Sequence, residues 1–210
     1  SRKGTLLPHL SKPDLTPLKI CPVLHSCFLT APAFAFLLLF GRHIEVQEKP
    51  DPTKCQLKVM KNATKHLSST SNVPIESTFV WCDYFSIAQE NAKIQQLAIL
   101  SLPAVASSLH AFVMVTPKAT HQDTQELCDL SSYKNRGWCR AEVFSHIARR
   151  GNNSLFVAED SETISKLPSS SDLTTTMCNV FGGNFTCCRL KHKHSKLCDR
   201  QHLVAPMLGL

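Results

Sequence analysis

The chain has 210 residues, of which 43% are hydrophobic and 19% are charged, and its formal net charge is +7. This balance excludes a wholly disordered chain, and the length allows one domain with a sizeable core and terminal extensions. The longest apolar run, residues 27–40, is shorter than the roughly 20 residues that cross a bilayer. We therefore expect a buried strand there and no membrane span.

The first half of the chain predicts strands that alternate with helices. Residues 1–26 are rich in Pro, Lys and Ser and are typical of an N-terminal tail. Apolar runs predict strands over Phe34–Phe40 and Phe79–Asp83. A helical pattern follows each strand: Thr53 can cap a helix that continues to Leu67, and a second helix covers Glu90–Leu100 with a short continuation from Pro103.

The second half continues the alternation. Ala111–Thr116 is a β-branched, apolar run that predicts a third strand, and Leu155–Ala158 predicts a fourth. Between them, residues 118–135 predict a long polar loop and Cys139–Arg150 a helix. This order predicts an α/β domain over residues 27–160, with a parallel sheet and helices on both faces. Residues 161–210 would add a connector and a basic C-terminal extension containing Cys and His.

Two segments bring polar side chains to the ends of predicted strands. Asp83, Ser86 and Gln89 follow the second strand. Trp138 and Glu142 lie one helical turn apart on the same face, so they would place a carboxylate beside an aromatic wall at a helix start. Ligands bind beyond the carboxyl ends of the strands in parallel sheets, so these groups are candidates for one site. The alternative is that Asp83 caps a turn, Trp138 belongs to the core and Glu142 is solvated.

The same residues resemble Toll/interleukin-1 receptor (TIR) domains and the similar fungal heterokaryon-incompatibility (HET) domains. TIR domains have a strand ending in Asp, a loop, a helix, a second apolar strand, and then a Tyr, Trp-Cys and Glu signature. Asp83, Tyr133, Trp138-Cys139 and Glu142 resemble that order. HET domains have Asp, a Ser-or-Cys-Ile-x-Gln loop and Arg-x-Trp followed by Glu, which resembles Ser86-Ile87-Ala88-Gln89 and Arg136-Gly137-Trp138 here. The resemblance covers residues 34–150 and implies a flavodoxin-like fold.

The resemblance also implies a signalling or defence domain, as in innate immunity, that hydrolyses NAD at the nicotinamide N-glycosidic bond. Glu142 would be the catalytic group, because a carboxylate stabilises the oxocarbenium-like transition state of that cleavage. Trp138 would line the pocket and Arg136 would hold a phosphate. The other substrate-binding candidates are Asp83, Ser86, Gln89 and His43, the last of which follows the first strand. NAD would be a substrate, and no cofactor is expected.

The alternative function is a non-catalytic module for self-association or adaptor binding, whose helix after the second strand docks a partner. An enzyme should place Glu142, Asp83 and Trp138 along one open cleft, whereas a module should expose Glu142 on a flat surface. Ala88 stands where relatives with a Ser-Ile-Pro-Gln loop have Pro, which leaves this loop less rigid. His146 follows Glu142 by one turn and is placed to pair with it.

The ten cysteines comprise scattered thiols and a C-terminal group. Cys82 lies in a predicted core strand and Cys139 at a helix start, where buried free thiols are common. We therefore expect mostly reduced cysteines and a cytoplasmic location. The C-terminal Cys187, Cys188 and Cys198 offer soft ligands, but their spacing fits no standard zinc finger, so no metal is expected. The basic tail could touch anionic lipid or nucleic acid, but it lacks interleaved aromatics, so we expect a solvated basic segment and no specific nucleic acid.

Overall fold

The computed structural model describes residues 19–20, 36–41, 51, 53–87, 91–121, 125–167, 172–183, 185–189, 191–192 and 198–209. Two of the candidate site residues, His43 and Gln89, lie outside the described residues. Among the helices of the described part, none combines the length and apolar character needed to cross a bilayer.

A six-stranded sheet forms the centre of the protein. Its order is β1-β3-β2-β4-β7-β8, in which the first five strands are parallel and β8 is antiparallel to β7. The strands are β1 (Lys19–Ile20), β2 (Phe36–Gly41), β3 (Thr78–Cys82), β4 (Ala111–Val115), β7 (Leu155–Ala158) and β8 (Ser165–Lys166). The prediction that the first three apolar runs form neighbouring parallel strands is confirmed, since β2 lies between β3 and β4.

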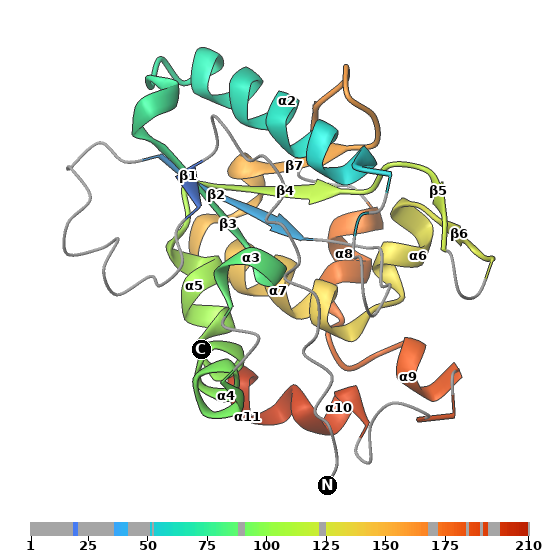
Figure 1. Ribbon diagram of the computed structural model, residues 1–210. Helices are drawn as coiled ribbons and strands as arrows, with labels where there is room; N and C mark the ends of the chain where they lie inside the picture. Colours follow the sequence, from blue (N-terminus) through green and yellow to red (C-terminus); the bar gives the residue numbers. More distant parts are fainter. Residues whose placement is uncertain are drawn as a thin grey trace, which may run out of the picture.

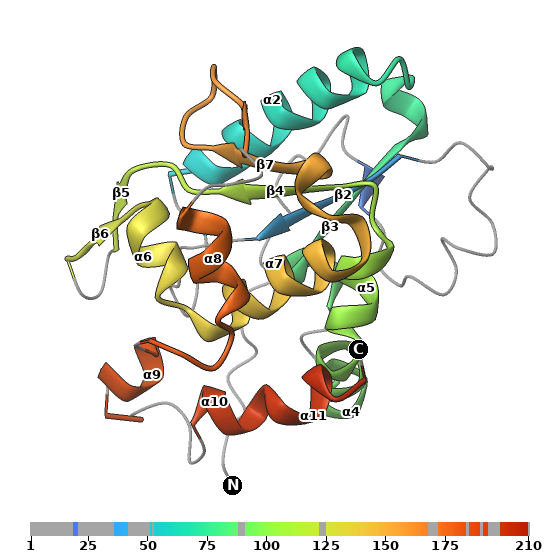
Figure 2. The same cartoon turned by 180° about the vertical axis from the view of Figure 1, so that it is seen from behind.

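Helices cover both faces of this sheet (Figure 1). Helix α2 (Cys55–Thr70) packs on one face, and α5 (Leu102–Ser108), α7 (Gly137–Arg150) and α8 (Asp172–Cys178) pack on the other (Figure 2). Strand β4 is buried along its whole length. Its Phe112 and Met114 join the cluster under α5 and α7, whereas Val113 and Val115 join the cluster under α2. A parallel strand covered on both faces needs such an uninterrupted apolar run.

Helix α2 begins differently from the prediction. The expected Thr53 cap is wrong, because Lys54 occupies the position before the helix and the carboxylate of Asp51 satisfies the first backbone amides. Asp51 accepts from Leu57 N at 2.8 Å and from Gln56 N at 3.3 Å. A carboxylate at this end also complements the helix dipole. The helix ends at Thr70, three residues beyond the predicted end.

The connection from β4 to α7 is more ordered than the predicted loop. It contains a hairpin of β5 (Ala119–Thr120) and β6 (Leu127–Cys128), followed by α6 (Leu130–Lys134). On the other side of the sheet centre, β3 is followed by α3 (Asp83–Ser86) and α4 (Ala92–Leu100). Short 3₁₀ turns over Ile75–Ser77 and Asn152–Ser154 lead into β3 and β7.

The C-terminal segment contributes to the fold. Leu167 and Met177, from the stretch expected to be a connector, are buried in the main core. Beyond α8 the chain forms α9 (Thr186–Arg189), α10 (Asp199–His202) and α11 (Val204–Met207). Phe185 and Leu203 of this part pack with Ala141 of α7 and Val180 in a separate apolar cluster. Helices α8 and α10 therefore contact the domain through α7, and α11 contacts it through α4 and α5.

Candidate functional site

The carboxyl edge of the sheet has a point where the chain leaves neighbouring strands in opposite directions. From β2 the chain proceeds to β3 on one side, and from β4 it proceeds to β7 on the other. Ligands of open α/β sheets bind at such a point. Thr116 follows β4 there, is 0% exposed, and uses its backbone amide to bond Ala158 O at 3.0 Å. Its Oγ1 has no hydrogen-bond partner among the described residues, which makes Thr116 a candidate contact that the sequence reasoning missed.

Asp83 and Ser86 come together in the single turn of α3 that follows β3. The Oγ of Ser86 accepts a hydrogen bond from Cys82 N at 3.1 Å, and this serine is 6% exposed. The Cys82 thiol donates to Asp83 Oδ1 at 3.5 Å. Asp83 is half-buried at the start of the helix. Ser86 thus closes the turn that holds the Asp83 carboxylate at the end of the strand.

A second turn fixes the start of α7. Asp129 caps α6 by accepting from Ser132 N at 2.9 Å, and Ser132 Oγ returns the contact by accepting from Asp129 N at 2.8 Å. This reciprocal cap satisfies two amides that a helix start leaves without partners. Arg136 N then donates to Tyr133 O at 3.1 Å, which closes α6 and leads directly into α7.

Three residues of the motifs singled out in the sequence, Arg136, Cys139 and Glu142, affect one buried phenol, that of Tyr133. Tyr133 is 0% exposed, and burial raises its pKa well above the ordinary value. The nearby Cys139 and Glu142 raise this pKa further, whereas the charge of Arg136 lowers it. Glu142 itself is 7% exposed.

Trp138 and Glu142 both belong to α7, as the four-residue spacing predicted. Trp138 is partly buried and packs against both the main core and the C-terminal cluster. The indole of Trp138 therefore joins the core cluster on the α7 face of the sheet to the cluster formed by the C-terminal segment. The 7% exposure of Glu142 fits neither an open cleft nor an exposed flat surface, the two arrangements expected for an enzyme and for a module.

Arg140, which the sequence reasoning did not single out, connects the site to the C-terminal segment. It is 2% exposed and donates to the carbonyl oxygens of Lys134, Val180 and Gly182 at 2.7 to 3.3 Å. Its guanidinium also lies 4.8 Å from the ring centroid of Phe185. Burial lowers the pKa of Arg140. Its place directly after Trp138-Cys139 in the signature was the one available signal.

His146 has partners other than the predicted Glu142. Its Nδ1 lies 3.0 Å from Ala106 O and its Nε2 lies 2.8 Å from Ser154 Oγ. A carbonyl oxygen can only accept, so Nδ1 carries the proton and Nε2 accepts from the serine. The ring is 0% exposed, and burial lowers its pKa. Its role is to join α7 to α5 and to the turn before β7.

The structure thus gathers the site residues into two groups. Asp83 and Ser86 lie at the end of β3, and Arg136, Trp138 and Glu142 lie in the first two turns of α7 or directly before them. The metal-binding side chains that come together among the described residues are Cys187, Cys188 and Cys198, outside the sheet. Comparison with known protein families, with curated proteins and with solved structures found no match to this chain.

Proposed function

We propose that this chain is a TIR/HET-like signalling domain of flavodoxin-like fold that acts in the cytoplasm through self-association. Taking β2 as the first core strand, the order β3-β2-β4-β7 reads second, first, third, fourth. This is the order of flavodoxin-like sheets. The free thiols of the eight described cysteines support a reducing compartment.

The observation that carries the proposal is an apolar patch on α4 and α11. Ile94, Leu97 and Leu100 recur every third residue along α4 and are 50%, 66% and 43% exposed. Val204 and Leu208, at 47% and 83% exposure, lie on or directly after α11, which packs against α4. Apolar side chains gathered on one surface mark interaction sites, whereas single exposed ones need no explanation. The patch includes the helix after the second core strand, which was expected to dock a partner.

The composition of α4 favours a second copy of this chain as the occupant. Its sequence, AKIQQLAIL, contains one charged residue, Lys93. An apolar patch can pair with itself about a two-fold axis without placing like charges opposite each other. The net charge of +7 opposes contacts between other surfaces of two copies. Five apolar side chains fall short of the roughly 800 Å² per partner of a standard interface, so we expect weak association that depends on concentration.

The test is to place a charge in the patch. Sedimentation velocity over a concentration series should show wild-type protein dimerising, and Leu97→Asp should remain monomeric because it buries a carboxylate in the interface. Leu127→Asp is the matched control, since Leu127 is also a well-exposed leucine, at 57%, but lies on the β5–β6 hairpin. A wild-type protein that stays monomeric throughout, or an equal effect of the two variants, would refute self-association through α4.

NAD cleavage is the second candidate, and the position of Arg136, Trp138 and Glu142 at the start of α7 supports it. A carboxylate that is 7% exposed acts in a medium where electrostatic stabilisation of a positive transition state is strong. Arg136 and Trp138 begin the same helix, where a phosphate and an aromatic ring of NAD would be held. Nicotinamide release by the purified protein tests this directly. Glu142→Gln should slow the release by about a hundredfold or more, and equal turnover by the two proteins would exclude Glu142 from the mechanism.

A further inference from the structure

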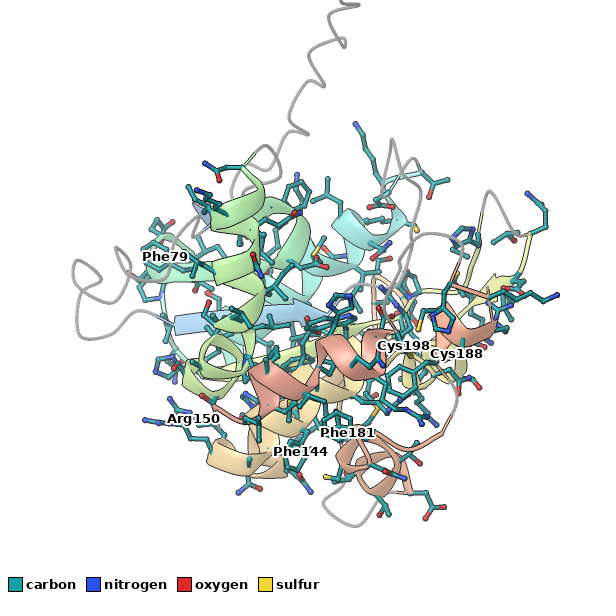
Figure 3. All side chains as sticks on the ribbon, turned by 90° about the horizontal axis from the view of Figure 1, so that it is seen from below. Phe79, Phe144, Arg150, Phe181, Cys188 and Cys198 are labelled. Carbon is teal, nitrogen blue, oxygen red and sulfur yellow. The ribbon has the colours of Figure 1, made fainter. Side chains whose placement is uncertain are left out.

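Three thiols from two short C-terminal helices converge on one point. Cys187 and Cys188 lie on α9, and Cys198 directly precedes α10. The Cys198 sulfur lies 3.7 Å from that of Cys187 and 3.5 Å from that of Cys188, and the three sulfurs all lie within 4.8 Å of one another. Figure 3 shows Cys188 and Cys198 side by side. Folding therefore overcomes the awkward spacing of two adjacent cysteines and a third ten residues later.

The distances between the sulfurs match those of thiolates that share a metal ion. Zinc binds thiolate sulfur at about 2.3 Å in tetrahedral geometry, so two sulfurs on the same ion lie about 3.8 Å apart. The two pairs that include Cys198 are within a few tenths of an ångström of that separation. A disulfide would need the sulfurs at about 2.05 Å. The cluster thus has the dimensions of a metal site before any ion is added.

The surrounding structure holds the thiols in place. Phe185, two residues before Cys187, is 2% exposed and packs between Arg140 and Arg200, whose guanidinium carbons lie 4.8 and 4.9 Å from its ring centroid. Cys187 packs against the same apolar cluster. Asp199 N donates to the Cys187 sulfur at 3.4 Å, a contact that stabilises a thiolate. Ligands positioned in advance bind an ion with a smaller loss of entropy.

The charge of the segment suits such a complex. Three thiolates and one Zn²⁺ carry a net charge of −1. Residues 187–202 contain five Lys or Arg against a single acidic residue, Asp199. Arg189 at the end of α9 pairs with Glu126, whereas Arg200 lies on α10, two residues after the third ligand. A basic segment around the cluster therefore stabilises an anionic metal–thiolate centre.

We propose that Cys187, Cys188 and Cys198 bind one zinc ion, with water in the fourth position. Each thiol loses its proton to solvent when it binds, so the ion replaces three protons and no electron is transferred. Three protein ligands and one open position are the arrangement of reactive zinc sites rather than of closed structural ones. The zinc site shares no residue with the α4 patch or with Glu142, so its test is independent of the test of the proposed function.

The experiment is zinc binding by the full chain, reduced with a phosphine and stripped of metal. Wild-type protein should bind one Zn²⁺ per chain in a competition titration with a chromophoric chelator. Cys188→Ser and Cys198→Ser should each weaken binding on the order of a hundredfold, because one of the few ligands is lost. Cys188 is exposed, so its replacement leaves the core intact. Cys178→Ser is the matched control, since Cys178 is an exposed free thiol on α8 and should leave binding unchanged.

A second readout identifies the ligands without any variant. Zinc should protect three thiols from alkylation, and peptide mapping should locate them at positions 187, 188 and 198. The proposal fails if wild-type protein and Cys198→Ser bind zinc equally tightly. It also fails if Cys178→Ser weakens zinc binding as much as Cys188→Ser. It also fails if peptide mapping of the protein as purified under non-denaturing conditions finds Cys198 in a disulfide with one of its neighbours.

Discussion

Gly137, the first residue of α7, has no room for a side chain. A Cβ at this position would lie 2.7 Å from Cδ1 of Phe185, still closer to Cε1 of the same ring, and 3.0 Å from Cδ1 of Leu203. Real Cβ atoms do not approach carbon so closely, so the ring of Phe185 would have to move. That ring is 2% exposed and is held by two guanidinium groups. In Gly137→Ala, the new methyl group at the start of α7 would therefore overlap the side chains of the C-terminal segment.

The magnitude follows from two opposing effects. Overpacking of a filled core costs about 1–3 kcal/mol. Replacing Gly by Ala in a helix contributes at most about 1 kcal/mol in the opposite direction, and less at a first helical residue. We expect the free energy of unfolding to fall by about 1–2 kcal/mol. For a chain of this size that lowers Tm by roughly 2–8 °C.

The assay is thermal unfolding followed by circular dichroism. Gly209→Ala is the matched control, because a Cβ there would make an ordinary contact of 3.5 Å with Pro206 O. Phe185→Leu in the Gly137→Ala background should recover part of the loss, since a smaller side chain leaves room for the new methyl group. The same Gly137→Ala variant should bind zinc more weakly than wild type. A Gly137→Ala variant as stable as wild type would refute the packing of Phe185 against the start of α7.

Three further predictions concern stability and thiols. His146 is buried in its neutral form, and burial lowers its pKa. Its contribution to the free energy of unfolding is therefore complete above pH 6.5 and is lost as the pH falls towards the folded-state pKa. The loss is at most about 1.4 kcal/mol per pH unit. Urea unfolding between pH 7.5 and 5.5 should show a shallower decline for His146→Gln than for wild type. Asp129→Ala removes the cap of α6 and should cost about 1 kcal/mol by the same measurement, and an unchanged midpoint would contradict that role. Thiol counting in denaturant with a chelator and without reductant should recover close to all ten cysteines, and recovery of only a few would exclude a reducing compartment.

The sequence predicted the sheet centre well because its strands are buried on both faces. Such strands read as continuous apolar runs that depend little on their neighbours. Leu155–Ala158 was predicted to the residue, and Ala111–Thr116 to within one residue. Thr53 was a reasonable cap by residue type, but the longer reach of Asp51 from a preceding turn decided the helix start. Lys19–Ile20 forms a strand only because it meets the backbone of β3, and no local pattern marks that pairing.

The site was harder to predict because tertiary packing decides burial. The spacing of Trp138 and Glu142 predicted that they share a helix, but the burial of Glu142 comes from tertiary packing around α7, which that spacing does not reveal. Leu167 and Met177 are isolated apolar residues in hydroxyl-rich surroundings, so periodicity could not place them in the core. The convergence of Cys187, Cys188 and Cys198 depends likewise on the burial of Phe185, which the sequence does not reveal.

The short edge strands of the sheet affect how readily the protein aggregates during expression and concentration. The outermost strands β1 and β8 pair over only two residues each, whereas the strands between them pair over four or five. A long, flat, apolar edge recruits strands from other molecules and promotes aggregation, and short edge strands reduce that risk. Removing residues 1–20 as a dispensable tail would uncover the apolar strand Thr78–Cys82 along one side. Expression boundaries for this domain should therefore begin before Lys19, and shorter versions should scatter light on concentration.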